Sequence, residues 1–406
     1  MVIYQNDWER VSLGEIASFH KGDVLSKSDL TTSGVPCILY GELYTRYKEI
    51  VGSVTSYCSP ELSGLTLSQA EDVLLPASGE TPEEMAKASC LTSSGVAIGG
   101  DIIIARPGPG VSGRFLSYQL NSVLVSKIAS VAQGNAVVHL NRERVSQLEA
   151  IIPSEMEQDA IADLLQGFDE HLANLDELIV KKKAIRDGAI DELVLARRRL
   201  GSFSDSWVSA SIPECADVLT GLTYSPDDLR KSGVLVLRSS NIQNNTICLG
   251  DNVYVRPEAV NSSAVERGDI LVCVRNGSVR LIGKTAQIDG YVPTMSTFGA
   301  FMSVLRPTAA DAQFLFYYTR TRRFKDQVTK VLGATINQIT RRDLAEFDLL
   351  VPPLEEQRAI AEVLSGMDEE IRLLEEERAK VERLKLGAMD DLLTGRVRLP
   401  IEETAA

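Results

Sequence analysis

Few residues of this chain have the types and spacing that bond-making chemistry requires. The three histidines, His20, His139 and His171, lack the close spacing of metal ligands. The stretch RPGPGVSG at 106–113 lacks the spacing of a dinucleotide-binding loop, and no phosphate-binding GxxxxGK motif or Asn-Pro-Pro-aromatic methyltransferase motif occurs. Paired carboxylates such as Glu355 and Glu356 are typical of a solvated helix face. We therefore expect no catalytic residue and no metal site.

The composition is that of a globular protein in water. The 406 residues suffice for two or more domains, and 44% are apolar and 24% charged. No apolar run reaches the ~18–20 residues that span a bilayer, and the first ten residues lack the apolar core of a signal peptide. The six cysteines are scattered without a CxxC pair, which favours reduced, mostly buried thiols in an intracellular, cytoplasmic protein.

The net charge of −14 is unevenly distributed along the chain. Residues 1–150 carry 11 basic and 16 acidic groups, whereas residues 201–349 carry 16 basic and 15 acidic groups. Because affinity for nucleic acid comes largely from neutralised phosphates, the total charge alone disfavours a nucleic-acid binder. The second of these segments is the richest in arginine, with Arg238, Arg275, Arg280, Arg320, Arg322 and Arg323.

The chain contains two copies of one sequence unit. A shift of 199 residues lays 151–200 over 350–399 without a gap, and EMEQDAIADLL at 155–165 over LEEQRAIAEVL at 354–364. The same shift brings Trp8 onto Trp207 and Gly22 onto Gly221. The middle stretches, about 45–110 and 244–305, do not align. This period is far above that of a solenoid repeat, so the chain is a duplicated unit with a variable middle in each copy.

Each copy ends in a predicted long helix, the first from 155 to about 195. Apolar residues follow a 4–3 spacing that indicates a narrow coiled-coil seam, and two such seams predict an antiparallel pair of helices. Gly188 and Gly387 fall inside the pattern, so we expect either a kink or the close approach of another backbone. The seam residues are Ile161, Leu165, Phe168, Leu172 and Leu175, and Ile360, Leu364, Met367, Ile371 and Leu374.

The remaining segments are strand-rich, with apolar runs such as 73–75, 102–104, 234–237 and 270–272 bounded by turn residues. One helix is predicted near the end of each, from Phe115 to Ile128 and from Phe314 to Val328. The expected fold class is α+β, with two similar mixed domains joined by two long antiparallel helices in an internal pseudo-twofold repeat. The expected boundaries are 1–150, 151–200, 201–349 and 350–406.

The stretch VPPLEEQRAIA at 351–361, followed by a heptad helix, resembles the conserved region of the specificity subunit of type I restriction–modification systems. The resemblance covers the whole chain, from the opening Trp-x4-Leu/Ile motifs at Trp8 and Trp207 to the runs LRSSNI at 237–242 and RGDIL at 267–271. It implies two target recognition domains, each reading one half of a split DNA site. The two helices would then act as a spacer.

The resemblance also implies the partners. The helices would dock two modification subunits, which are S-adenosylmethionine-dependent adenine methyltransferases, and through them the ATP-driven restriction subunits. S-adenosylmethionine, ATP and magnesium are therefore expected on the partners, and no cofactor on this chain. With diverged domains on similar helices, one chain can read an asymmetric DNA sequence and hold two like partners.

Polar and basic residues in loops near the turns are the candidates for DNA contact, since Arg favours guanine and Asn or Gln favours adenine. Tyr40-Gly41-Glu42 in the first copy departs from the Arg238–Asn241 pattern of the second, which weakens the transfer between them. The candidates are Lys21, Lys27, Tyr40, Tyr44, Arg46, Asn135 and His139 in the first copy, and Tyr224, Arg238, Ser240, Asn241, Arg275, Asn276, Lys284, Asn337 and Gln338 in the second.

Two other interpretations fit the sequence. A coiled-coil adaptor that only tethers proteins would show no DNA sequence preference even in a complex. A self-contained DNA-modifying enzyme would act on DNA without a partner subunit.

Overall fold

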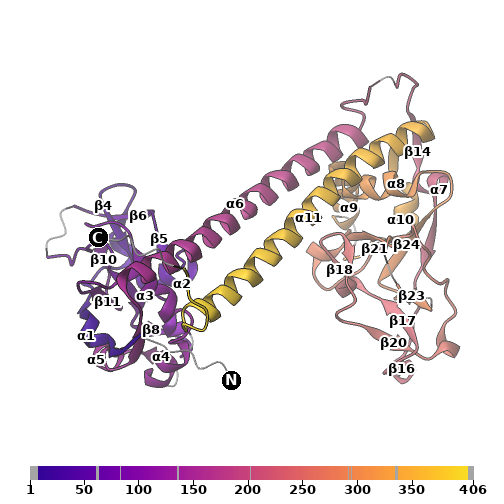
Figure 1. Cartoon of the computed structure of the whole chain (residues 1–406). Helices are drawn as coiled ribbons and strands as arrows, with labels where there is room; N and C mark the ends of the chain where they lie inside the picture. Colours follow the sequence, from indigo (N-terminus) through magenta and orange to yellow (C-terminus); the bar gives the residue numbers. More distant parts are fainter. Residues whose placement is uncertain are drawn as a thin grey trace. The chain divides into compact units, whose positions relative to one another are not determined.

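The computed structural model describes residues 8–60, 64–82, 84–134, 137–201, 203–290, 292–293, 295–333 and 337–400. Asn135 lies outside these ranges. The chain divides into two compact units, one formed by Met1–Asp176 with Glu376–Ala406 and the other by Glu177–Glu375. Each unit holds a strand-rich domain, the first at residues 8–152 and the second at 207–351, together with part of each long helix (Figure 1).

The first domain is built on two sheets. The larger has the order β2 (Ala17–Lys21), β11 (Ile102–Pro107), β7 (Val73–Pro76), β9 (Ser89–Leu91) and β5 (Ile50–Val51). The smaller has the order β10 (Ala97–Ile98), β4 (Val35–Ile38), β6 (Ser56–Cys58) and β3 (Leu30–Thr31). Two further pairs are β1 (Glu9–Ser12) with β13 (Glu149–Ile152), and β8 (Ser78–Gly79) with β12 (Val138–His139). The short helices are α1 (Leu13–Ile16), α2 (Tyr40–Thr45), α3 (Gly113–Leu120), α4 (Val125–Val131) and α5 (Arg142–Ser146).

The second domain repeats this plan. One sheet has the order β15 (Ala216–Thr220), β24 (Met302–Pro307), β21 (Ile270–Cys273) and β22 (Thr285–Gln287). The other has β16 (Leu229–Arg230), β20 (Val253–Val255), β17 (Val234–Leu237) and β23 (Ser296–Phe298). Two further pairs are β14 (Val208–Ser211) with β25 (Asp348–Val351), and β18 (Ile242–Gln243) with β19 (Thr246–Ile247). The helices are α7 (Ile212–Cys215), α8 (Ala312–Arg320), α9 (Arg322–Leu332) and α10 (Arg341–Glu346).

The single helix predicted at the end of each domain is wrong, because each is two helices. In the second domain Thr321 leaves the helical conformation between α8 and α9, and its hydroxyl accepts a hydrogen bond from the Phe324 amide. A threonine at this position caps the second helix, which explains the break. In the first domain residues 121–124 separate α3 from α4.

The predicted buried strands are confirmed, and both cores are closed in the same way. All residues of β7, β17 and β21 are buried. Trp8 packs edge-on against Phe115, and Trp207 against Phe314, each with ring centroids 6.3 Å apart. The duplication therefore extends from the sequence to the packing of the core aromatic residues.

Gly22 and Gly221 are required by close backbone contact. A Cβ at Gly22 would lie 2.0 Å from the Gly99 carbonyl oxygen, and one at Gly221 would lie 2.1 Å from that of Gly299. Any side chain here would force two loops of the domain apart.

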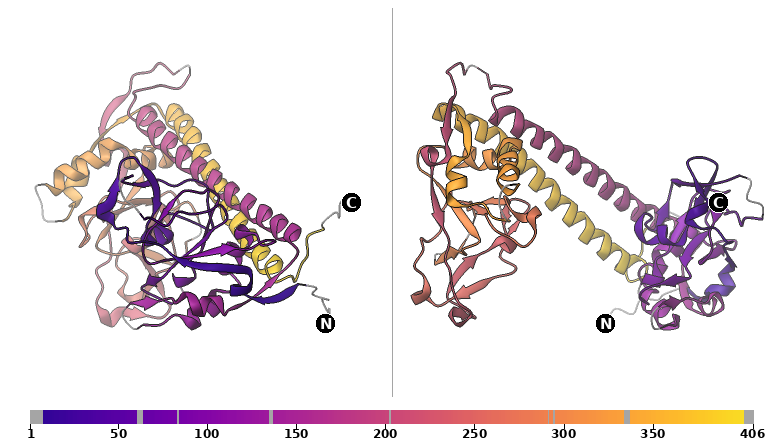
Figure 2. Two further views of the ribbon diagram at one scale, coloured as in Figure 1. Left: turned by 90° about the vertical axis from the view of Figure 1, so that its left-hand side faces the viewer. Right: turned by 180° about the vertical axis from the view of Figure 1, so that it is seen from behind.

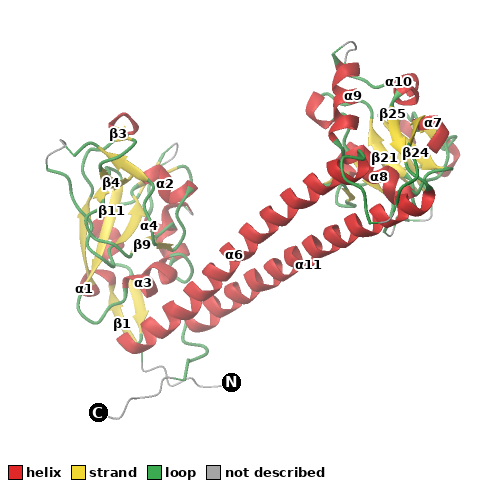
Figure 3. Cartoon of the chain, turned by 90° about the horizontal axis from the view of Figure 1, so that it is seen from above, coloured by secondary structure: helices red, strands yellow, loops and turns green. Residues whose placement is uncertain are grey.

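Two long helices, α6 (Glu155–Val194) and α11 (Leu354–Leu392), pack against each other (Figure 2). Arg378 Nε lies 2.6 Å from Asp176 in the first unit, and Arg186 Nη1 lies 2.9 Å from Asp368 in the second. Later residues of one helix thus meet earlier residues of the other, which confirms the antiparallel pair. Figure 3 shows that the strands belong to the two domains. Within the described part of the chain, no helix is long and apolar enough to cross a membrane.

The predicted seam residues are buried or half-buried, and those at the ends of the seam pack into the cores of the two domains. Ile161 and Leu165 belong to the core of the first domain, which also takes in Met389, Leu392 and Leu393. In the second domain, Ile360 and Leu364 join a core that contains Ile190, Leu193 and Val194. Each core is therefore completed by the start of one helix and the end of the other. Farther along, Leu172, Leu175 and Ile371 are at most 5% exposed, whereas Phe168, Met367 and Leu374 are half-buried.

The prediction of close backbone approach at Gly188 and Gly387 is wrong within this chain. Both residues are exposed, both lie inside uninterrupted helices, and a Cβ at either would meet no described atom within 4 Å. The other two glycines of the helices, Gly167 and Gly366, are open in the same way.

Candidate nucleic-acid interface

Three loops of the second domain meet at the ends of β17 and β21. The Asn276 side chain donates to the Ser239 hydroxyl over 2.9 Å, which joins the loop after β21 to the loop after β17. Arg275 forms an isolated antiparallel bridge with Gln338. Lys284 donates from Nζ to the Ile242 carbonyl oxygen over 2.7 Å. The structure therefore brings together most of the candidates that the sequence suggested in this domain.

Arg275 lies on the surface of this cluster, and Phe301 holds it in place. The guanidinium carbon is 5.0 Å from the centre of the Phe301 ring, and Phe301 is 55% exposed. A cation over an aromatic face is attracted by the ring quadrupole, so the guanidinium is oriented before any ligand arrives. The sequence pattern did not single out Phe301, because it lies in the stretch that does not align between the copies.

Asn241, which the sequence suggested as a base-reading residue, is buried and stabilises its loop. It is 0% exposed, its Oδ1 accepts from the Arg238 amide over 2.9 Å, and its Nδ2 donates to the carbonyl oxygens of Cys248 and Asp251. Because its amide oxygen and nitrogen are buried and bonded within the domain, this side chain cannot form hydrogen bonds with a base. Ser240 beside it is exposed, and Arg238 is half-buried with Nη2 2.8 Å from Asp251.

Arg238, Tyr224 and Asn337 complete the set. The Nε of Arg238 is buried and has no hydrogen-bond partner among the described residues. Tyr224 is half-buried against Leu222, Val234 and Val255, and no described contact joins it to Arg275. Asn337 has φ 48°, a left-handed conformation that asparagine tolerates well.

Four first-domain candidates line one hollow of about 940 Å³, namely Lys21, Lys27, Tyr40 and Arg46. Lys21, Lys27 and Tyr40 are exposed, whereas Glu42, also in the lining, is buried. Its Oε1 is 2.6 Å from the Ser56 hydroxyl and 2.9 Å from Arg46 Nη1. The hollow therefore combines cationic groups with a buried carboxylate that is paired with Arg46.

The two remaining described candidates of the first domain meet at Ser78 instead. Tyr44 donates to the Ser78 carbonyl oxygen over 2.8 Å, and the Ser78 hydroxyl lies 3.1 Å from Nδ1 of His139. Burial raises the pKa of the Tyr44 hydroxyl, so it remains a donor. His139 is exposed.

The expectation that Glu355 and Glu356 form a solvated pair is wrong for Glu356. Its carboxylate is 0% exposed, accepts from the Trp207 indole over 3.0 Å and binds Arg199 at 2.5 Å. Glu157 repeats this in the first unit with Trp8 and Arg398. Each arginine stacks on the tryptophan, at 6.0 Å for Arg199 and 5.7 Å for Arg398. We call each such group of a tryptophan, a glutamate and an arginine a clamp. It joins the domain, through the tryptophan, to the start of one long helix and to the residues after the end of the other.

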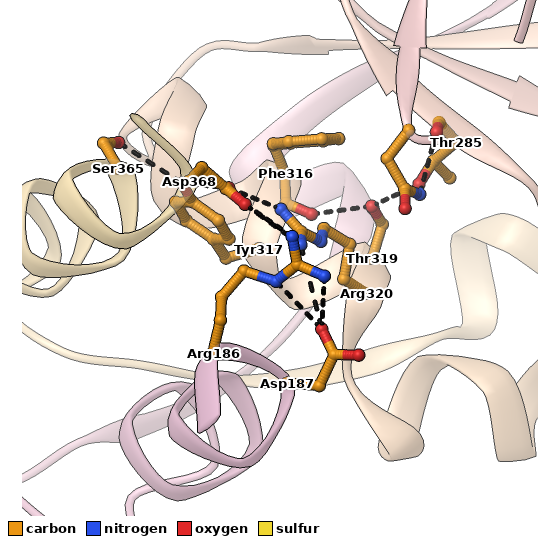
Figure 4. A network of polar contacts seen from close by, with 10 residues as sticks. Arg186, Asp187, Thr285, Phe316, Tyr317, Thr319, Arg320, Ser365 and Asp368 are labelled. Carbon is orange, nitrogen blue, oxygen red and sulfur yellow. Dashed lines mark hydrogen bonds and ion pairs between the residues drawn. The ribbon is translucent and has the colours of Figure 1, made fainter. Parts of the chain in front are cut away.

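A second clamp lies farther along each helix, and Figure 4 shows the one in the second unit. In the second unit Asp368 of α11 accepts from Tyr317 over 2.8 Å and binds Arg320 and Arg186 at 2.7 and 2.9 Å. Burial alone would raise the pKa of Asp368, but Arg320, Tyr317 and Arg186 outweigh it and hold the pKa below its usual range. Burial raises the pKa of Tyr317 to about 12, so it stays a donor. Arg320 is therefore structural and not available to a ligand.

The first unit carries the equivalent clamp around Asp169 of α6. Tyr118 donates to this carboxylate over 2.7 Å, and Lys385 of α11 lies 2.7 Å from it and 3.2 Å from Glu49. Tyr118, Asp169 and Lys385 match Tyr317, Asp368 and Arg186 at the 199-residue shift. In both units one helix supplies the acid and the other supplies a cation.

The described side chains offer little to a metal or a nucleophile site. No group of three or more His, Cys, Asp or Glu residues that could hold a metal ion occurs among them. All six cysteines are free, and five are buried, in agreement with the prediction. Burial raises the pKa of Cys37 to about 12, aided by Cys58 and Glu42, so this thiol remains protonated and unreactive.

Comparisons with known proteins agree with this architecture. Residues 204–383 match the family described as type I restriction modification DNA specificity domain. The chain is 23% identical over 414 residues to the type I restriction enzyme MjaVIII specificity subunit of Methanocaldococcus jannaschii, covering 97% of this chain and 93% of that protein. It is 30% identical over 177 residues to the EcoKI specificity subunit of Escherichia coli K12, covering 41% and 37%. The structure matches the S subunit of M. genitalium with a TM-score of 0.61, 15% identity and 97% of each chain covered.

Proposed function

Since the chain belongs to the DNA specificity subunits of type I restriction–modification systems, we propose that each domain reads one half of a bipartite DNA site. The observation that carries this proposal is the contrast within the repeat. The core aromatic residues, clamps and helices match at the 199-residue shift, whereas the polar side chains at the sheet ends differ between the domains. Two copies of one scaffold with different surfaces suit an asymmetric target.

The reading residues that we propose are the exposed or half-exposed candidates. Tyr44, Asn241 and Lys284 support the loops, because their polar atoms bond within the domain. Phosphate contact comes in part from partner subunits, because this chain carries a net charge of −14. The proposed set is Lys21, Lys27, Tyr40, Arg46 and His139 in the first domain, and Tyr224, Arg238, Ser240, Arg275, Asn276, Asn337 and Gln338 in the second.

The long helices are the proposed spacer and the docking surface for two modification subunits. Exposed apolar residues recur on them at the repeat distance: Leu164 with Val363, and Ile185 with Leu384. An open glycine follows each by three residues and so lies on the same helix face. Small residues allow a partner helix to approach closely, and two like surfaces suit two like partners.

The chemistry is assigned to the partners. S-adenosylmethionine would bind the modification subunits, and ATP with magnesium would bind the restriction subunits that join through them. The assembly would work in the cytoplasm, where the chromosome lies.

A domain exchange tests this function directly. Residues 201–349 are replaced by the matching segment of a relative with a different target, and the variant is assembled with its modification subunits. We expect methylation to change in one half of the recognised site and to stay unchanged in the other. A change in both halves would contradict reading by separate domains. No sequence preference in the assembled complex would favour the adaptor, and methylation by the chain alone would favour the enzyme.

A further inference from the structure

The backbone forms the same three-segment junction in both domains. In the second domain the Val274 amide donates to the Phe301 carbonyl oxygen over 3.0 Å, and the Ile339 amide donates to the Val274 carbonyl oxygen over 2.8 Å. In the first domain the Ala77 amide donates to the Asp101 carbonyl oxygen over 2.7 Å. The Leu140 amide donates to the Ala77 carbonyl oxygen over 2.9 Å. These bonds connect equivalent segments in both domains, although two of the three segments in each domain lie in the stretch whose sequence does not align.

The strand registers identify which residues correspond. In the first domain Ile103 of β11 lies opposite Lys21, and in the second Ser303 of β24 lies opposite Thr220. Lys21 and Thr220 are one repeat apart, so Asp101, two residues before Ile103, corresponds to Phe301.

The other two positions correspond in the same way. Ser78 pairs with His139 in the first domain, and Arg275 pairs with Gln338 in the second. His139 and Gln338 are again one repeat apart. Each domain thus has a reading edge of three positions: Ser78, Asp101 and His139 in the first, and Arg275, Phe301 and Gln338 in the second.

The chemistry of the two edges is opposite. Arg275 carries a full positive charge stacked on the exposed Phe301 ring, which presents a cation beside an apolar face. Asp101 is exposed with φ 59°, and its side chain lines the same hollow as Lys21 and Lys27. The other two residues of this edge are polar, and the Ser78 hydroxyl lies 3.1 Å from Nδ1 of His139. In the major groove arginine pairs with guanine, an aromatic ring contacts the thymine methyl group, and a carboxylate accepts from the cytosine amino group.

We propose that these two edges are the base-reading sites, with Phe301 and Asp101 as specificity-determining residues. Phe301 packs on a thymine methyl group and directs Arg275 onto a neighbouring guanine. Asp101 accepts a hydrogen bond from a cytosine amino group in the other half-site. The inference rests on the proposed function and adds the bases to it. It also gives the acidity of the first domain a role, because a carboxylate there faces DNA and selects a donor.

The test uses the assembled complex of this chain with its modification subunits and a randomised library of bipartite sites. Phe301→Ala and Phe301→Leu remove the ring from an exposed position. Asp101→Asn changes an acceptor into a mixed donor and acceptor, and it keeps a residue that tolerates positive φ. Leu229→Ala and Glu9→Gln are matched controls, since both side chains are exposed and lie away from the edges.

We expect both Phe301 variants to lower discrimination by about 5- to 100-fold at a thymine or its neighbouring guanine in one half-site only. Asp101→Asn should do the same at one cytosine in the other half-site, and the controls should change neither. Uniform weakening across all sequences, or no change at all in a complex that still reads its site, overturns the assignment. If the domain exchange moves a half-site while these variants do not, the edge is wrong and the proposed function stands.

Discussion

Among single residues, the turn that follows each long helix differs between the two copies. One copy has an alanine with positive φ at a position where the other has a glycine. Gly395, in the turn after α11, has φ 68°, and its counterpart Ala196, in the turn after α6, has φ 57°. Alanine in this region brings its Cβ close to the next carbonyl oxygen, which costs about 1 kcal/mol more than for glycine. The first copy therefore keeps a strained helix end that the second has relieved.

Exchanging these residues should move stability in opposite directions. Ala196→Gly relieves about 1 kcal/mol of strain, and the added freedom of glycine in the unfolded chain offsets about 0.4–1 kcal/mol of this gain. We therefore expect a net rise of up to about 0.5 kcal/mol in the free energy of unfolding. Gly395→Ala should lower it by a similar amount. Urea unfolding of the two variants measures both values. A loss of stability in Ala196→Gly would show that the left-handed end carries no strain.

Asp368 predicts a pH dependence. Its pKa is depressed in the folded chain, so its ionisation stabilises the fold above the unfolded-state pKa of about 3.9. This contribution is lost as the pH falls below that value and through the lower folded-state pKa. We expect Asp368→Asn to be less stable than the parent near pH 7, with a gap in melting temperature that narrows below about pH 4. A constant gap at every pH would contradict the assignment.

At the scale of elements, the clamps explain how domains and helices are joined. Lys385 is only 10% exposed and lies between Asp169 and Glu49, each 18% exposed, with its ammonium 5.5 Å from the centre of the Tyr118 ring. Removal of a buried cation leaves its carboxylates uncompensated, which costs far more than the loss of a surface pair.

We expect Lys385→Ala to lower the free energy of unfolding by about 2–4 kcal/mol. The control is Arg10→Ala, because the pair of Arg10 with Glu149 is 69% and 56% exposed and should contribute under about 1 kcal/mol. Denaturant midpoints of both variants give the comparison. Equal effects would mean that the clamp is no more important than a surface ion pair.

The elements also show what the sequence can and cannot predict. The helices, the seam and the buried strands can be predicted because the spacing of apolar residues along a short stretch of sequence indicates them. The burial of Glu356 does not, because its partners Arg199 and Trp207 come from distant segments. Phe301 and Asp101 were missed for the same reason, since strand register and not sequence alignment relates them. Gly188 and Gly387 suggested close contact, yet an added Cβ at either would meet no atom of the described residues within 4 Å.

At the level of the whole molecule, the chain is a duplicated scaffold whose two domains carry, as we propose, different reading surfaces. Scaffold residues match at the repeat distance, as with Trp8 and Trp207 or Asp169 and Asp368. The reading edges do not match. Selection for two half-sites would act on the edges alone and leave the clamps and helices alike.

Methylome sequencing of the host with and without this gene would show whether the chain specifies a bipartite DNA site. We predict one methylated motif that needs the gene, made of two different short sequences separated by a fixed, unspecified spacer. Restoring the gene with Phe301→Ala should relax one part of the motif and leave the other part and the spacer unchanged. A continuous motif, a motif that persists without the gene, or relaxation of both parts together would contradict the account.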